Sequence, residues 1–153
     1  MTVVQTVDVA VPVSTAYNQW TQLEEFPHFM QGVQSVEQID DTHSRWRTNV
    51  LGAHREFETR ITEQIPDERI AWTTTHGETD QAGVVTFHRL DTDHTRVTVQ
   101  MDVGKDGLLE KLGVATGVVD RQIANDLGRF KEFIEERGAA TGAWRGSVDR
   151  PQP

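Results

Sequence analysis

The fold is decided by residues 106–137, which read DGLLEKLGVATGVVDRQIANDLGRFKEFIEER. Apolar residues recur there at steps of three, four or seven, the pattern of one buried face on an α-helix. Asp106 can cap its first turn, and Gly138 follows as a stop signal. At ~1.5 Å per residue this helix would be ~45 Å long, which is more than local packing requires. The apolar positions are Leu108, Leu112, Val119, Ile123, Leu127, Phe130 and Ile134, and a parallel stripe of small residues contains Gly113, Gly117, Ala124 and Gly128.

The chain before this helix begins with a predicted strand and two short helices. Residues 3–11 alternate apolar and polar side chains, as a half-buried strand does. Pro12 ends this strand, and Ser14 is predicted to cap a short helix. A second short helix or turn around residues 24–27 brings a dense group of aromatic side chains. We expect this segment to lie over an apolar surface, because so many aromatic rings are not left in water.

Six further strands are predicted over residues 33–39, 44–51, 54–65, 69–75, 83–90 and 96–103. The second and third of these form a hairpin around residues 52–53. Opposite charges across the strands favour a register that places Arg47 opposite Glu58 and Asn49 opposite Glu56. The inward face of the hairpin then carries Trp46, Thr48, Val50, Arg55, Phe57, Thr59 and Ile61.

These elements predict an α+β fold in which a curved seven-stranded antiparallel sheet wraps around the long C-terminal helix, with two short helices after the first strand. One domain spans residues 1–137, and the Gly-, Ala- and Pro-rich residues 138–153 are expected to form a mobile tail. The small-residue stripe and the aromatic segment indicate that helix and sheet do not meet completely. We therefore expect an apolar cavity between them.

Composition excludes several classes of function. The 153 residues carry a net charge of −9, which argues against a general nucleic-acid or anionic-membrane binder. The absence of cysteine excludes disulfides, thiolate metal sites and a cysteine nucleophile. There is neither a signal-peptide pattern nor an apolar run of the ~20 residues that a membrane span requires. A soluble, cytoplasmic protein is expected.

Several short segments, in order, resemble the START-related polyketide cyclase/dehydrase superfamily, which has the helix-grip fold. They are residues 9–14 (VAVPVS), Trp20 with residues 26–30 (FPHFM), residues 61–64 (ITEQ), residues 69–72 (RIAW), residues 83–87 (GVVTF) and residues 130–134 (FKEFI). The resemblance covers about residues 3–144. It implies an internal apolar cavity that binds lipids, quinones or polyketides, and in some members cyclisation or dehydration of a poly-β-keto chain.

Two functions follow as alternatives. The first is binding of a small hydrophobic, lipid-, quinone- or polyketide-like ligand between the sheet and the C-terminal helix. The second is a polyketide aromatase/cyclase or dehydratase that acts on a poly-β-keto chain in the same cavity. A weaker reading is a quinone-handling or structural accessory domain. A ligand-binding protein would tolerate loss of a charged cavity residue, whereas an aromatase/cyclase or dehydratase needs a polar group that positions carbonyls.

Arg55 and His28 are the candidate catalytic residues. The resemblance implies that a cavity arginine such as Arg55 could hold and polarise a ligand carbonyl or carboxylate. The alternative is a rim arginine whose stem covers apolar surface while its guanidinium stays in water. His28, near the expected entrance, could act as a general base.

The predicted ligand contacts are the apolar, aromatic and threonine side chains of the inward faces. Aromatic rings there could stack on a ligand or simply fill the core, and several hydroxyls among them fit a cavity wall. No metal site and no cofactor are predicted, because the six histidines do not cluster. Outward Val114 and Val118 leave a homodimer open. The predicted contacts are Trp20, Phe26, Phe29, Met30, Trp46, Thr48, Arg55, Phe57, Thr59, Trp72, Thr74, Val85, Phe87, Val99, Met101, Leu112, Thr116, Val119 and Ile123.

Overall fold

The computed structural model describes residues 2–50, 52–77, 81–103 and 116–149. A seven-stranded antiparallel sheet has the order β1-β7-β6-β5-β4-β3-β2. Its strands are β1 (Thr2–Val9), β2 (Val33–Gln38), β3 (His43–Val50), β4 (Ala53–Ile65), β5 (Arg69–Gly77), β6 (Gln81–Asp91) and β7 (His94–Val103). The helices are α1 (Val13–Trp20), the 3-10 helix η1 (Leu23–His28) and α3 (Thr116–Arg137).

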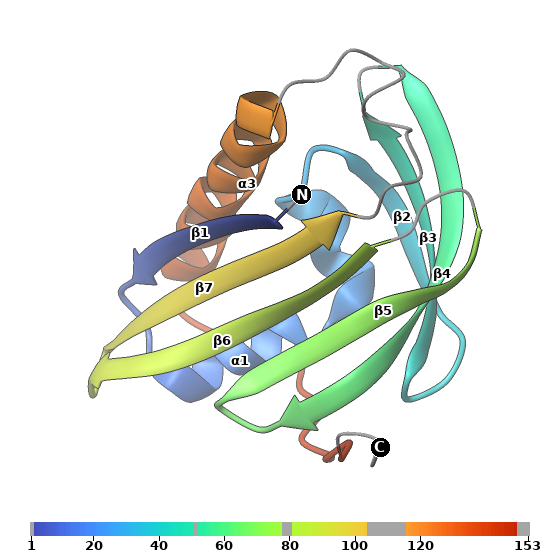
Figure 1. Ribbon diagram of the computed structural model, residues 1–153. Coiled ribbons are helices and arrows are strands. Elements are labelled where there is room, and N and C mark those ends of the chain that lie inside the picture. The colour runs from blue at the N-terminus through green and yellow to red at the C-terminus, as the bar shows by residue number, and fades with distance from the viewer. Residues whose placement is uncertain (1, 51, 78–80, 104–115, 150–153) are drawn as a thin grey trace.

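The sheet is strongly curved, and α1 and α3 lie on its concave side (Figure 1). This arrangement confirms the predicted α+β helix-grip architecture, with short helices between the first two strands. The core lies between the helices and the sheet. Side chains from both layers meet there: the Trp20 ring of α1 packs edge-on against Phe130 of α3, with 5.0 Å between ring centroids. Leu127, Phe130 and Ile134 of α3 are buried, as the helical periodicity predicts.

The predicted C-terminal helix is described from residue 116 onward. Residues 106–115, including the proposed cap Asp106, lie outside the described residues. The predicted stop is confirmed, because Gly138 has a φ of +69° and its N–H donates to the Ile134 carbonyl at 2.9 Å. Glycine adopts this left-handed conformation without the steric cost of a Cβ atom, which is why it ends helices so often.

The predicted register of the β3–β4 hairpin is wrong by two residues. Arg47 pairs with Glu56, and Arg45 takes the place opposite Glu58. The loop includes Gly52, at a φ of +83°, while Ala53 already pairs with Val50 in the ladder. The observed register also brings the Arg45 guanidinium within 3.7 Å of Glu37, 3.8 Å of Glu56 and 3.1 Å of Glu58. Because a two-residue shift leaves every side chain on its original face, the predicted inward face is unchanged.

The predicted cap of α1 is also wrong. The helix begins at Val13, and Pro12 rather than Ser14 occupies the N-cap position. Pro12 has a φ of −60°, and its carbonyl accepts a hydrogen bond from the Ala16 N–H at 3.1 Å. The proline ring fixes the backbone angle at the point where the chain turns from strand to helix, so no side-chain oxygen is required to start the helix there.

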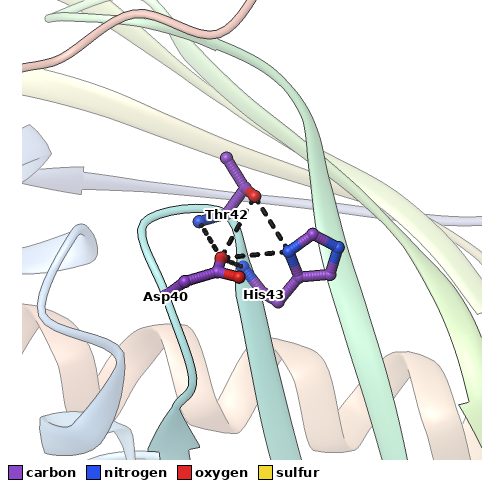
Figure 2. A network of polar contacts seen from close by, with 3 residues as sticks. All are labelled: Asp40, Thr42 and His43. Atoms are coloured by element: carbon purple, nitrogen blue, oxygen red, sulfur yellow. Dashed lines mark hydrogen bonds and ion pairs between the residues drawn. The ribbon is translucent and has the colours of Figure 1, made fainter.

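The turn between β2 and β3 is closed by the Asp40 carboxylate (Figure 2). One of its oxygens accepts hydrogen bonds from the Thr42 N–H at 2.8 Å and the His43 N–H at 2.8 Å, and it lies 3.0 Å from His43 Nδ1. These bonds, led by the one from the Thr42 N–H, lower the pKa of Asp40 to about 2. The turn between β6 and β7 has the same kind of hydrogen bond, in which the Asp91 carboxylate accepts from the Asp93 N–H at 2.8 Å.

Residues 139–149, expected to be mobile, follow a hydrogen-bonded course along α1 and the end of β4. The Thr141 N–H donates to the buried Gln19 amide oxygen at 2.9 Å, and the Gln19 amide nitrogen donates back to the Thr141 hydroxyl at 3.0 Å. The Trp144 N–H donates to the Thr21 hydroxyl at 3.0 Å. At the end of the segment Val148 forms an antiparallel bridge with Gln64. We call residues 139–149 the C-terminal strap.

Candidate functional site

A cavity of about 250 Å³ lies between the concave face of the sheet, the α1–η1 connection and α3. Most of its lining is aliphatic or aromatic, with a few polar side chains among them. A concave apolar surface with a small number of polar groups is the usual form of a small-molecule site. The predicted contacts that line it are Trp20, Phe26, Met30, Trp46, Thr48, Arg55, Phe57, Thr59, Trp72, Val99, Met101, Val119 and Ile123.

Stacked aromatic rings form the wall that the β3–β4 hairpin provides. Trp46 pairs directly with Phe57 across the two strands, and their ring planes are 4° apart with centroids separated by 6.2 Å. The Trp46 indole N–H donates to the Thr59 hydroxyl at 2.9 Å, which fixes the orientation of the ring. Phe26 of η1 meets Trp46 edge-on with 5.6 Å between centroids. This wall gives the cavity an aromatic, apolar border.

Arg55 lies on the cavity wall, as the predicted inward face requires. It pairs with Thr48 across the hairpin, and its guanidinium Nη1 donates to the His54 carbonyl at 2.9 Å. Three further polar residues line the cavity from other elements: Gln81 from β6, and Gln122 and Asp126 from α3. The cavity therefore combines apolar walls with hydrogen-bond donors and acceptors from both layers of the fold.

Asp126 is a cavity carboxyl that the sequence interpretation missed. It is mostly buried, and this burial raises its pKa above the ordinary value for aspartate, against the opposing effect of hydrogen bonds from Arg129 and from the Gln31 N–H at 3.2 Å. Arg129 also donates to the Phe29 carbonyl at 3.2 Å, so the pair joins α3 to the segment after η1. Its position one turn after Ile123, within the predicted apolar face, is the feature of the sequence that indicates it.

His28 lies on the outer side of η1. Its side chain is 62% exposed, its Nε2 lies 3.0 Å from the Glu25 carboxylate, and its ring stacks on Phe133 at 6.0 Å. The lining, as far as the structure describes it, does not include His28. The proposed role as a general base stays a prediction, and this position does not favour it.

Several other predicted contacts are not among the residues that line the cavity in the described part of the chain. Phe29, Val85 and Phe87 are core residues, and Thr74 accepts a hydrogen bond from the Gln81 N–H at 3.2 Å. Leu112 lies outside the described residues, as does the side chain of Thr116. Ten lining residues were not among the predicted contacts, although Ile61 and Leu127 lie on faces that the sequence predicts to be apolar. They are Leu23, Gly32, Val33, Ala53, Ile61, Ile70, Gln81, Gln122, Asp126 and Leu127.

Two negative findings hold for the described residues. They contain no group of three or more His, Cys, Asp or Glu side chains that could hold a metal ion. Among the described helices, none is long and apolar enough to cross a membrane.

The curved sheet, the C-terminal helix and the cavity between them define a helix-grip protein with an internal small-molecule site. Residues 9–132 match the family of polyketide cyclase/dehydrase and lipid transport proteins, and the chain belongs to this family. An uncharacterized 17.2 kDa protein from the melC2-rnhH intergenic region of Streptomyces lincolnensis is 61% identical over 144 residues, which are 94% of this chain and 96% of that protein.

Two solved structures share the fold. The Zhui aromatase/cyclase of Streptomyces sp. R1128 superimposes with a TM-score of 0.73 at 20% identity, over 94% of this chain and 99% of that one. A START superfamily protein of Mycobacterium smegmatis gives a TM-score of 0.67 at 20% identity, over 89% and 95% of the two chains. These two structures show the fold, and the match of residues 9–132 to the family confirms the polyketide cyclase/dehydrase resemblance seen in the sequence.

Proposed function

We propose that this protein binds a small hydrophobic, ring-containing molecule in the cavity between the sheet and α3. The observation that carries the proposal is the lining itself, in which the parallel Trp46 and Phe57 rings border a space of about 250 Å³. That volume of about 250 Å³ is slightly below the ~300–1,000 Å³ typical of ligand sites, which favours a compact ligand over a long flexible chain. Membership of a family of polyketide cyclase/dehydrase and lipid transport proteins supports a hydrophobic ligand.

Ligand binding would act through apolar burial with a few orienting polar contacts. Each flat ring that leaves water against an aromatic wall contributes roughly 25 cal/mol per Å² of apolar surface. Arg55, Gln81 and Gln122 could then orient an oxygen-bearing group of the ligand, because their side chains supply hydrogen-bond donors at the lining. The aromatic rings would then provide most of the affinity, and the polar groups would fix the orientation of the ligand.

Native mass spectrometry of protein purified from its own host tests the proposal. We expect a complex whose mass exceeds that of the chain, and the bound molecule should be released when the protein unfolds. After extraction, the same molecule should raise the melting temperature of the ligand-free protein when it is added back. At 100 times its Kd a ligand stabilises by about 2.7 kcal/mol, which is roughly 5–10 °C for a chain of this size.

Two variants make the binding test specific. Phe57→Ala truncates the aromatic wall and should abolish most of the thermal shift, whereas Val4→Ala, at a position on the outside that is 52% exposed, should leave it unchanged. A cavity that holds no molecule from the host and shows no thermal shift with any small ring compound would contradict the proposal.

The second candidate is catalysis on a poly-β-keto chain, which the polar residues of the lining favour. Arg55 and the hydroxyl of Thr48 lie side by side in the ladder, where they could hold two carbonyl oxygens of a folded chain. The mostly buried carboxyl of Asp126 also lines the cavity. An enzyme of this kind would fix the conformation of a reactive chain in a space shielded from water.

Arg55→Ala separates the two candidates. An enzyme should lose turnover of a poly-β-keto substrate while its fold and melting temperature are retained, whereas a carrier should keep its ligand. Arg47→Ala on the outward face of the same hairpin is the matched control, because its guanidinium lies 3.6 Å from Glu56 and away from the cavity. Equal turnover in both variants would contradict a catalytic role of Arg55.

The remaining predictions from the sequence concern partners and location. A cytoplasmic protein with no nucleic-acid partner fits the net charge of −9. A homodimer through Val114 and Val118 stays a prediction, since the side chains of both residues lie outside the described part of the chain. Sedimentation of the purified protein at several concentrations tests it.

A further inference from the structure

One row of inward-facing positions crosses the middle of the sheet and contains a gap. Trp72 of β5 pairs with Gly83 of β6, and Gly83 pairs with Met101 of β7. Ile61 of β4 continues the row beyond Trp72. Directly paired residues of neighbouring strands share a face, so all four positions face the cavity side. Ile61, Trp72 and Met101 line the cavity, and the glycine between them carries no side chain.

The Trp72 indole occupies the place that a side chain at position 83 would take. A Cβ atom built on Gly83 would lie 2.4 Å from Cζ2 of Trp72 and 2.9 Å from its Cε2 and Cη2. These distances are far below a van der Waals contact between carbon atoms, which is ~3.5–4.0 Å. The six-membered part of the indole therefore rests directly on the backbone of β6, and only glycine permits this.

We propose that Gly83 is a specificity-determining residue that sets how large a ring system the cavity accepts, and that its preferred ligands are flat systems of two or three fused rings. The inference rests on the proposed binding function. With any larger residue at position 83 the indole must move. The strand lies behind the indole, and Ile61 and Met101 lie beside it in the row, so we expect the ring to move toward the cavity. Gly83 thus determines the depth of the site without contacting the ligand.

The variant Gly83→Ala tests the proposal with a series of amines that differ in ring number: aniline, 1-aminonaphthalene and 1-aminoanthracene. Overpacking by one methyl group predicts that Gly83→Ala weakens binding of 1-aminoanthracene about ten-fold or more, measured by fluorescence titration, while the affinity for aniline changes less than about two-fold. Gly128→Ala is the matched control. Its added Cβ has nothing within 4 Å, so the affinities should equal those of the wild type.

A second variant keeps the test decisive if Gly83→Ala folds poorly. Trp72→Phe removes part of the ring system that rests on Gly83, so we expect it to improve binding of 1-aminoanthracene, and the double variant Gly83→Ala/Trp72→Phe to recover affinity lost in the single one. If wild-type protein binds the series and neither variant changes the preference for ring number, the role of Gly83 is refuted. If the wild-type protein binds none of the amines, both the preferred ligand class and the role of Gly83 are refuted. The proposed binding function is contradicted as well only if, in addition, no molecule co-purifies from the host.

Discussion

The buried hydrogen bond between Tyr17 and Gln64 allows a sharp prediction about stability. The Gln64 amide nitrogen donates to the Tyr17 hydroxyl at 2.9 Å, and the two residues are 4% and 0% exposed. The bond joins α1 to β4. Tyr17→Phe keeps the ring, which packs edge-on against Phe87 at 5.4 Å, and removes only the acceptor.

The expected cost follows from leaving one buried polar group without its partner. Tyr17→Phe and Gln64→Leu should each lower the free energy of unfolding by about 1–3 kcal/mol. In a chain of 153 residues this lowers the melting temperature by roughly 2–4 °C per kcal/mol. The double variant leaves neither group unpaired, so its cost should fall short of the sum of the single costs by about 0.5–3 kcal/mol.

Urea unfolding at pH 7, followed by circular dichroism, measures all four proteins of this cycle. Thr6→Val is the control, because the Thr6 hydroxyl forms an exposed bond with Thr98 at 3.1 Å and its loss should cost less than about 0.5 kcal/mol. Additive costs of Tyr17→Phe and Gln64→Leu, or costs no larger than that of Thr6→Val, would refute the reasoning.

Three further predictions concern pH and the C-terminal strap. The pKa of Asp40 is lowered from 3.8 to about 2, so the stability that its turn provides is present above pH ~4 and is lost as pH falls toward 2; Asp40→Asn should abolish this acid-dependent part, and carboxyl NMR titration measures the pKa directly. Burial raises the pKa of Asp126, so the contribution of this side chain to stability is largest below its pKa in the unfolded chain and is lost as pH rises through its pKa in the folded protein. Asp126→Asn keeps an acceptor for the Gln31 N–H and should raise the melting temperature at pH 7. A lower melting temperature of this variant would contradict the account. Deleting residues 139–153 removes the hydrogen-bond partners of Gln19 and Thr21. This deletion should speed amide hydrogen exchange in α1 and leave the exchange rates of β6 and β7 unchanged. Exchange rates in α1 that are the same before and after the deletion would show that the strap does not hold α1.

The order of elements was accessible from the sequence because each depends on local periodicity. Alternation placed Trp46 and Phe57 on the inward face, and the helical repeat placed Phe130 and Ile134 in the core. The hairpin register was not accessible, since two candidate registers both pair opposite charges and differ only in the loop. Its error left the site intact, because the two registers share their inward faces.

The cavity itself depends on contacts between distant segments, which local patterns do not contain. In the sequence, Asp126 is one polar residue within a helical pattern, and only the folded structure shows that it lies beside the segment after η1. Gly83 reads as a weak point in a strand until Trp72 is placed over it. For the same reason Phe87, which faces inward as predicted, proved to be packed against Tyr17 and Trp20 rather than at the cavity.

The length, irregular pairing and charge of β2 affect whether the protein aggregates at high concentration. β2 is an edge strand of only six residues, and its pairing with β3 shifts register between Val33 and Ser35. Its solvent side carries Glu37, which is drawn toward Arg45 of the neighbouring strand. A short, bulged and charged margin is a poor template for recruiting another chain. The form of β2 therefore disfavours fibril formation through this edge of the sheet.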